Sequence, residues 1–184
     1  MFTISRLKYL YLAHFSKPAA DRVLYRAIQK HRFRAILEIG LGSAERALRM
    51  IRLAQRAGGA EPVRYIAIDM FEARPAETRG LSLKEAHRLL KATGAHIQLI
   101  PGDPASALAR SANGLGPLDL VIISGDHDEQ PLSGAWFYVP RILHAGSKLY
   151  LESGGSREQG RPLNLLPASE VEQRASAQRR RRAA

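Results

Sequence analysis

The sequence predicts an open, mostly parallel α/β sheet with helices on both faces. Short apolar runs alternate five times with segments of helical periodicity, and such alternation requires crossover connections between parallel strands. The apolar runs are nearly continuous, which is typical of strands covered on both faces. The 184 residues suffice for one domain with a sizeable core, and the apolar content of 45% is ordinary.

Five strands and five helices are expected. The strands cover residues 35–39, 63–69, 96–103, 118–124 and 147–153. Helices are expected over residues 19–32, 44–57, 81–94, 104–112 and 134–146, the last one bent or split at Pro140. In the helix over 44–57 the apolar stripe faces the core, so the arginines at the remaining positions are expected in solvent. These are Arg46, Arg49, Arg52 and Arg56.

Charge divides the chain into three parts. Residues 1–34 hold eight Lys and Arg against one acid, residues 35–153 hold thirteen of each sign, and residues 154–184 hold seven Arg against three Glu. We expect a basic N-terminal helical segment, a core and an Arg-rich, partly disordered tail with these bounds. The basic arms indicate either solvated ends or an acidic partner, such as RNA or an anionic membrane face.

Composition excludes several functional classes. The chain has no cysteine, which excludes disulfides, thiolate catalysis and cysteine-based zinc sites and fits a cytoplasmic location. No run of about 18 apolar residues is present, so no membrane span is expected. The N-terminal segment is a poor signal peptide, because its apolar part is short and interrupted by Lys8.

The turn EIGLGSA (38–44) after the first strand is the expected ligand site, since open parallel sheets bind ligands outside the carboxyl ends of their strands. Two ligand classes compete for it. A dinucleotide needs a third glycine, but that position holds Glu45, whose carboxylate would repel a pyrophosphate. S-adenosylmethionine has no phosphate, and its positive amino acid portion suits the acid Glu38 at the strand end.

The pattern Glu38-x-Gly40-x-Gly42 resembles motif I of the class I, Rossmann-like, S-adenosylmethionine-dependent methyltransferases. The resemblance covers about residues 35–153 and implies S-adenosylmethionine as the cofactor. It implies that Asp69 binds both ribose hydroxyls and that Asp103 contacts the adenine amino group. The implied donor-binding residues are Glu38, Gly40, Gly42, Asp69, Met70, Asp103 and Ser124.

From the residues alone, simpler roles stay open. The glycines suit a bare tight turn, and Asp69 is suited to capping the helix that follows it. Asp103 precedes Pro104, which matches a helix N-cap with proline at the first helical position.

The segment DLVIISGDHDEQ (119–130) is similar to the D-L-V-F-I-D-G-D-H segment of a small-molecule O-methyltransferase branch, with Ser124 in place of the strand-end Asp. The resemblance implies that Asp126 and His127 lie at the acceptor. An imidazole that titrates near neutral pH can take a proton from an attacking hydroxyl, so His127 is the candidate base. A solvated loop is the alternative. No metal site is predicted, since the fifth strand ends without the Asp-Asn pair of metal-dependent relatives.

The predicted function is S-adenosylmethionine-dependent O-methylation of a small or carbohydrate-like acceptor. Alternatives are a non-catalytic module of this fold, or an RNA methyltransferase, that binds RNA through the basic arms. A nicotinamide-dependent enzyme is disfavoured by Glu45.

The sheet looks shortened after its fifth strand, since RPLNLLP (161–167) offers one short strand at most. An open strand edge tends to pair. We therefore expect a second copy in a homodimer, an N-terminal helix or the tail to cover it.

Overall fold

A six-stranded sheet forms the centre of the computed structural model, which describes residues 6–59, 61–75, 80–124, 129–153 and 161–183. The strand order is β3-β2-β1-β4-β5-β6. The first five strands are parallel and β6 is antiparallel to β5, which confirms the predicted Rossmann-like, mostly parallel sheet. The strands are β1 (Ala35–Ile39), β2 (Arg64–Asp69), β3 (His96–Pro101), β4 (Leu118–Ile123), β5 (Leu143–Glu152) and β6 (Leu163–Leu166).

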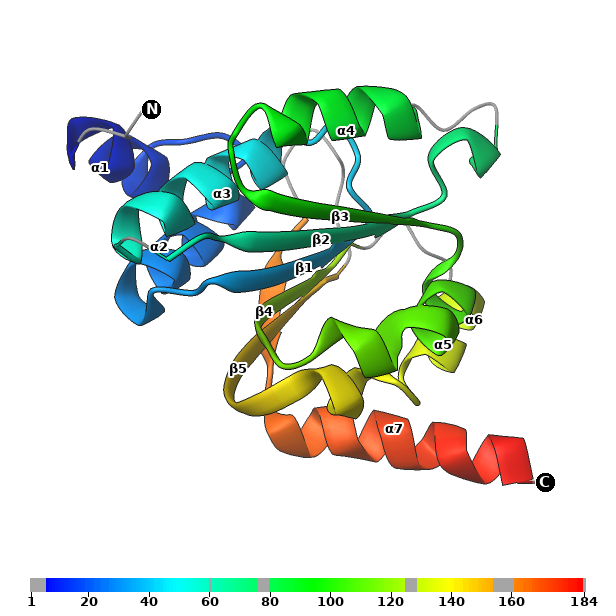
Figure 1. Ribbon diagram of the computed structural model, residues 1–184. Helices are drawn as coiled ribbons and strands as arrows, with labels where there is room; N and C mark the ends of the chain where they lie inside the picture. The colour runs from blue at the N-terminus through cyan, green and yellow to red at the C-terminus, as the bar shows by residue number, and fades with distance from the viewer. Residues whose placement is uncertain (1–5, 60, 76–79, 125–128, 154–160, 184) are drawn as a thin grey trace.

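Helices cover both faces of this sheet (Figure 1). One layer contains α1 (Arg6–His14), α2 (Arg22–His31), α3 (Glu45–Ala57) and α4 (Leu83–Lys91). The other contains α5 (Pro104–Leu115), α6 (Glu129–Ala135) and α7 (Ala168–Ala183). Successive strand residues enter opposite layers, as the pleat requires: Ile36 packs against the first layer and Leu37 against the second. Three short 3₁₀ segments complete the chain: η1 (Ala19–Asp21), η2 (Phe71–Ala73) and η3 (Val139–Ile142).

The expected helix over 134–146 is wrong in its second half. Helix α6 ends at Ala135, η3 follows, and β5 already begins at Leu143. Pro140 explains the break, because proline lacks the N–H that a helix needs and its ring clashes with the preceding turn. Val139 and Ile142 are buried on either side of it, so the short segment is held by packing.

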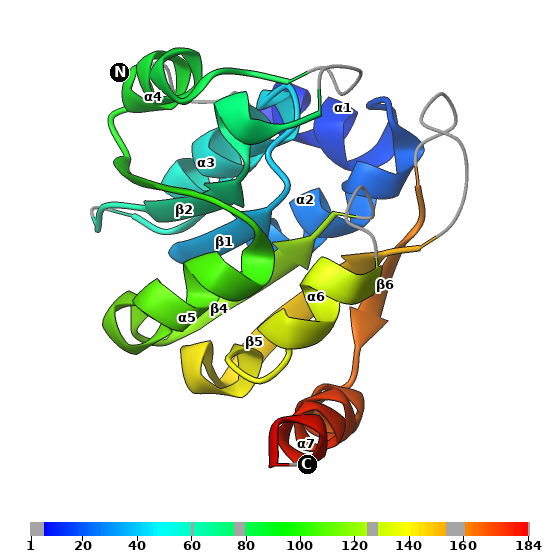
Figure 2. The ribbon, with the colours of Figure 1, turned by 90° about the vertical axis from the view of Figure 1, so that its right-hand side faces the viewer.

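Residues 161–183 form a strand and a helix, and the partial disorder expected of the tail over 154–184 stays a prediction. Strand β6 pairs with β5, and α7 follows it along the lower edge of the molecule in Figure 1 and Figure 2. Helix α7 docks through Val171 and Ala175, which are buried, and the Arg174 guanidinium lies 4.9 Å from the centre of the Trp136 ring. Burial and a cation–π contact therefore hold a helix whose sequence is mostly polar.

The edge of the fifth strand is covered by this same chain. Leu149 faces Leu166 and Glu152 faces Leu163 across the β5–β6 pair. Of the three covers expected from the sequence, the tail is therefore the one that pairs with β5, and no second copy is required there. The edge strand of the sheet at this side is therefore β6, which is only four residues long.

The N-terminal segment, expected to be helical, contains a second helix before the one expected over 19–32. Helix α1 packs beside α2 through Leu12, which belongs to the same core as α2 and α3. Within the described parts of the chain, none of the helices has both the length and the apolarity required to cross a bilayer.

Candidate functional site

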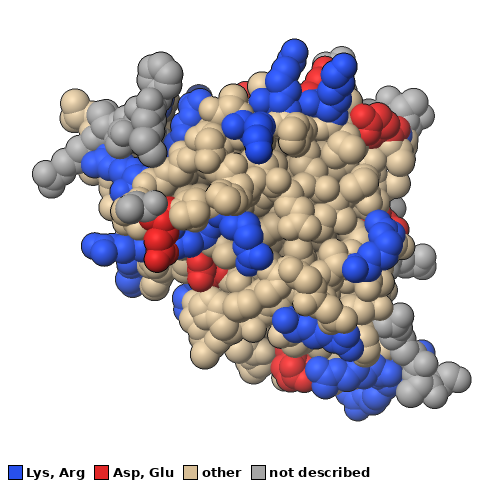
Figure 3. Space-filling model, viewed as in Figure 1, with Lys and Arg blue, Asp and Glu red and all other residues tan. Residues whose placement is uncertain are grey.

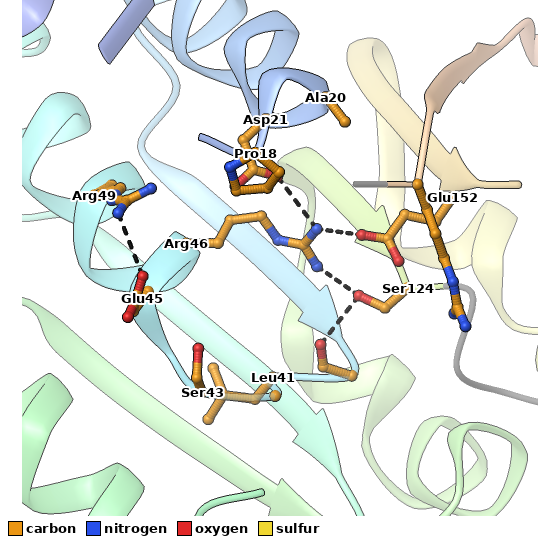
Figure 4. A pocket seen from close by; sticks show the side chains of 13 residues that line it. Pro18, Ala20, Asp21, Leu41, Ser43, Glu45, Arg46, Arg49, Ser124 and Glu152 are labelled. Atoms are coloured by element: carbon orange, nitrogen blue, oxygen red, sulfur yellow. Dashed lines mark hydrogen bonds and ion pairs between the residues drawn. The ribbon is translucent and has the colours of Figure 1, made fainter. Parts of the chain in front are cut away.

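A pocket of about 380 Å³ lies outside the carboxyl ends of β1, β4 and β5 (Figure 4). Its wall includes the start of α2, the glycine turn after β1, the first turns of α3 and the ends of β4 and β5. A volume of this size suits a small organic ligand. The charged residues of its lining are Asp21, Glu45, Arg46, Arg49, Glu152 and Arg161.

The glycine turn contains three left-handed backbone positions, at Gly40, Gly42 and Ala44. Gly40 has φ 90° and Gly42 has φ 60°, values that residues with a Cβ rarely adopt. Among the described atoms nothing lies within 4 Å of the point where a Cβ of Gly42 would stand. Because both glycines line the pocket, the turn brings bare backbone to its wall and leaves room beside it.

Neighbouring strands hold this turn in place. The Gly40 N–H donates to the Ile68 carbonyl at 2.9 Å, and the Leu41 N–H donates to Asp69 Oδ2 at 2.7 Å. The Ser124 hydroxyl at the end of β4 donates to the Gly40 carbonyl at 3.1 Å. The turn is therefore fixed from both sides of β1 by β2 and β4.

Arg46 joins four segments of the chain at the floor of the pocket, and Figure 4 shows three of these contacts, to Asp21, Ser124 and Glu152. Its Nε donates to Glu38 Oε1 at 2.6 Å, and its Nη2 lies 2.5 Å from Ser124 Oγ. Its Nη1 pairs with Glu152 and lies 3.5 Å from Asp21 Oδ1. Only 16% of the Arg46 side chain is exposed. We call Arg46 and its three carboxylate partners, Asp21, Glu38 and Glu152, the Arg46 cluster.

The Arg46 cluster holds three carboxyl groups around one guanidinium. Burial raises the pKa of Glu38 and of Asp21, and the nearby Arg46 opposes that rise for both groups. Burial disfavours the charged guanidinium as well, but Glu38, Glu152 and Asp21 outweigh it and raise the pKa of Arg46 well above its ordinary value. A guanidinium that stays protonated is thus fixed among three carboxyl groups.

Glu38 itself is enclosed. The residue is 0% exposed, one carboxylate oxygen accepts from Arg46, and the other accepts from the Tyr65 hydroxyl. Glu38 is therefore not among the residues that line the pocket, and its contact with a ligand stays a prediction. The carboxylates on the pocket wall at this point are Asp21 and Glu152.

Asp69 is the last residue of β2 and is almost fully buried. Its oxygens accept from the N–H groups of Leu41 and Phe71, and Arg74 Nη2 lies 2.5 Å from Oδ2. Asp69 thus ties the glycine turn to the segment that follows β2 and lies beside the pocket rather than on its lining. Met70, which follows it, is half-buried and also lies off that lining.

Asp103 caps helix α5. Its Oδ1 accepts from the Ser106 N–H at 3.0 Å, with Pro104 at the first helical position. This hydrogen bond lowers the pKa of the Asp103 carboxyl. The geometry is that of the N-cap that the sequence left open, and its role toward an adenine group stays a prediction.

Gly40, Gly42 and Ser124 are the predicted site residues that the structure brings together on one pocket wall. Asp126 and His127, the residues predicted at the acceptor, lie outside the described residues. Across the described ranges, no group of three or more His, Asp or Glu side chains is placed to hold a metal ion.

Sequence reasoning missed the centre of this site. Arg46 was expected in solvent with the other arginines of its helix, but the first turn of α3 faces the strand ends and buries its side chain. Asp21 is 131 residues from its cluster partner Glu152 in the sequence, so only the fold reveals the group. One signal was available: a lone acid at the end of the fifth strand, Glu152, in register with the strand ends around it.

The fold is shared with solved methyltransferase structures. CalS11, a TDP-rhamnose 3'-O-methyltransferase of calicheamicin biosynthesis, aligns with a TM-score of 0.58 at 18% identity, over 85% of this chain and 68% of that one. TomG from Streptomyces achromogenes, an O-methyltransferase of tomaymycin synthesis solved with S-adenosylmethionine, aligns at 0.55 and 17%, over 79% and 63%. An O-methyltransferase from Bacillus cereus solved with S-adenosylhomocysteine gives 0.55 and 16%, over 79% and 64%.

These likenesses show a common fold. The chain spans 63% to 68% of the lengths of those three proteins. At the level of sequence, no protein-family model and no curated protein matches the chain.

Proposed function

We propose that this protein is an S-adenosylmethionine-dependent methyltransferase that acts on an oxygen of a small or carbohydrate-like acceptor. The observation that carries the proposal is the glycine turn, with left-handed Gly40 and Gly42 on the wall of a ligand-sized pocket at the carboxyl ends of the strands. The shared fold with three O-methyltransferases supports it, and one of these acts on a sugar nucleotide.

The residues of the pocket fit such a donor. S-adenosylmethionine supplies an activated methyl group on a sulfonium, and it carries positive charge without a phosphate. The open space beside Gly42 accommodates a ligand against the backbone, and Asp21 and Glu152 offer carboxylates to a positive group. Glu45 on the same wall is exposed and pairs with Arg49, and its negative charge disfavours a pyrophosphate there.

In this proposal the chain promotes methyl transfer mainly by holding the donor and the acceptor in the correct orientation. Asp69 and Ser124 fix the glycine turn, while Arg46 ties the ends of β1, β4 and β5 to the N-terminal segment. Transfer of a methyl group between aligned atoms requires orientation above all, and a rigid floor supplies it. Asp126 and His127 are the proposed residues at the acceptor, with His127 taking the hydroxyl proton.

Titration calorimetry with S-adenosylhomocysteine tests the donor site. We expect binding by the wild type, and a loss of about tenfold in affinity, or about 1.4 kcal/mol, in Gly42→Ala, because the new Cβ stands in the space beside the turn. Gly94→Ala is the matched control. Gly94 also has a left-handed φ, 76°, and open space around its Cβ position, but it precedes β3 at the opposite end of the sheet.

The control separates backbone strain from ligand contact. Both substitutions strain a left-handed position to a similar degree, so they are expected to lower thermal stability alike. Equal affinities of Gly42→Ala and Gly94→Ala for S-adenosylhomocysteine, or no binding by the wild type, would contradict the proposal.

The acceptor side is tested by methyl transfer from labelled S-adenosylmethionine to a panel of sugar nucleotides and phenols. His127→Gln is expected to lower kcat with little change in donor affinity, since the base acts on the acceptor hydroxyl. Unchanged turnover by His127→Gln would remove His127 from the mechanism and leave the donor site unaffected.

A further inference from the structure

Helix α1 carries apolar side chains on every side, yet one side of it faces solvent. Leu12 packs into the core beside α2 and is 4% exposed. On the outer side Leu7 is 79%, Leu10 42%, Tyr11 58% and Phe15 67% exposed. We call these four side chains the α1 surface. Single exposed apolar residues are ordinary, but a group of this kind on one short helix marks an interaction site.

The surroundings of the α1 surface are basic. A hollow of about 440 Å³ between α1 and α3 is lined by Tyr11 and Phe15 together with Lys8, Lys17 and Arg52. The acid that residues 6–34 contain is Asp21, which is buried in the Arg46 cluster. An apolar surface bordered by cations is complementary to a partner that offers both hydrocarbon and negative charge.

We propose that the α1 surface docks the protein on an anionic lipid bilayer. Leucine and aromatic side chains enter the boundary between headgroups and acyl chains, while flanking Lys and Arg contact the anionic headgroups. Single-stranded RNA is the competing partner, because bases stack on exposed aromatic rings beside cations. Leu7 and Leu10 decide between the two, since an aliphatic side chain gains from acyl chains but offers no stacking platform.

The location of α1 allows such docking. Figure 1 places α1 at the left margin of the molecule, next to α2 and away from α7. Arg49 lines both the hollow beside α1 and the glycine-turn pocket. The docked orientation therefore sets that pocket beside the membrane. The proposal does not depend on methyl transfer, and it is tested without it.

Flotation with lipid vesicles provides the test. The full chain is mixed with vesicles of phosphatidylcholine, with or without phosphatidylglycerol, at low and at high salt. We expect binding to the anionic vesicles that weakens as salt rises, and weak binding to the neutral ones. The double substitution Leu7→Glu with Phe15→Glu is expected to lower the bound fraction at least about tenfold.

Two further variants test whether the effect is specific to the α1 surface and to the charge beside it. Leu165→Glu changes an equally apolar side chain, 50% exposed on β6, and is expected to bind as the wild type does. Lys8→Glu with Lys17→Glu removes the charge beside α1 without touching its apolar residues, and is expected to lose the preference for anionic vesicles. Circular dichroism confirms that each variant is folded.

Three outcomes would overturn the proposal. One is equal flotation of the wild type and the Leu7, Phe15 variant. Another is the absence of flotation together with an RNA affinity that this variant loses. The third is a dimer in light scattering that the same variant converts to a monomer, which would assign the α1 surface to a second copy of the chain.

Discussion

Arg46 shows how one side chain can hold several parts of a fold together. It bridges carboxylates from the N-terminal segment, β1 and β5, and the side chains of Asp21, Glu38 and Glu152 are at most 12% exposed. In Arg46→Met these carboxylates lose their cation in a buried site. We expect the free energy of unfolding to fall by about 3–5 kcal/mol, measured by chemical denaturation at neutral pH.

The pH dependence of this loss has a definite sign. Burial raises the folded-state pKa of Glu38, and removing Arg46 raises it further. A carboxyl group whose folded pKa is raised stabilises the fold at low pH, and that contribution is lost as the pH rises through the folded pKa. The deficit of Arg46→Met is therefore expected to shrink as the pH is lowered. Arg52→Met, an exposed position on the same helix, is the control and should change stability by less than about 1 kcal/mol.

Asp103 allows a second test at a single residue. Its carboxylate accepts the Ser106 N–H at the start of α5, so Asp103→Ala should cost about 1 kcal/mol of unfolding free energy. The folded pKa of Asp103 is lowered, so its contribution is present above the ordinary aspartate pKa, about 3.9, and is lost as the pH falls through the folded value. A cost that persists unchanged in acid would show that the cap does not depend on charge.

At the scale of elements, the docking of α7 is the feature most open to test. Val171 faces the core and Gln173 faces solvent on the same helix. Val171→Asp buries an unpaired carboxyl group and is expected to cost about 2 kcal/mol or more and to detach the helix. Limited trypsin digestion should then cut sooner at Arg174, while Gln173→Asp should leave the digestion pattern unchanged. Equal cleavage of both variants would show that α7 is held by other contacts.

The elements were predictable where local pattern and tertiary environment agree. The bounds expected for β1, β2, β3, β4 and α3 lie within two residues of those observed, because continuous apolar runs and amphipathic stripes report burial directly. Strand β6 and helix α7 lack such patterns. Strand β6 forms because Leu163 and Leu166 are buried and its backbone pairs with the edge of β5. The polar helix α7 is held by the buried side chains of Val171 and Ala175. Neither condition can be seen in the segment itself.

At the scale of the whole molecule, the net charge of +11 predicts affinity for polyanions. Figure 3 shows the basic side chains of one face in several separate groups. If the C-terminal arm contacts phosphates, replacing Arg179 to Arg182 by Gln should reduce the slope of log affinity for single-stranded RNA against log salt by up to about 3. Replacing Lys84, Arg88 and Lys91 on α4 is the comparison, and an equal effect there would show that the arm has no special part in binding.

The sequence by itself determined the five parallel strands and the position of the glycine turn at the end of β1. Those features depend on short-range pattern: apolar runs, helical spacing, and glycines where the backbone must turn tightly. Tertiary structure alone decided the partners of the side chains. It enclosed Glu38 behind Arg46, turned Asp69 toward the Leu41 N–H of the turn, and brought Asp21 to Arg46 and Glu152. The reason is physical: the pairing of buried charges is set by which segments meet in space, and local spacing along the chain carries no record of that meeting.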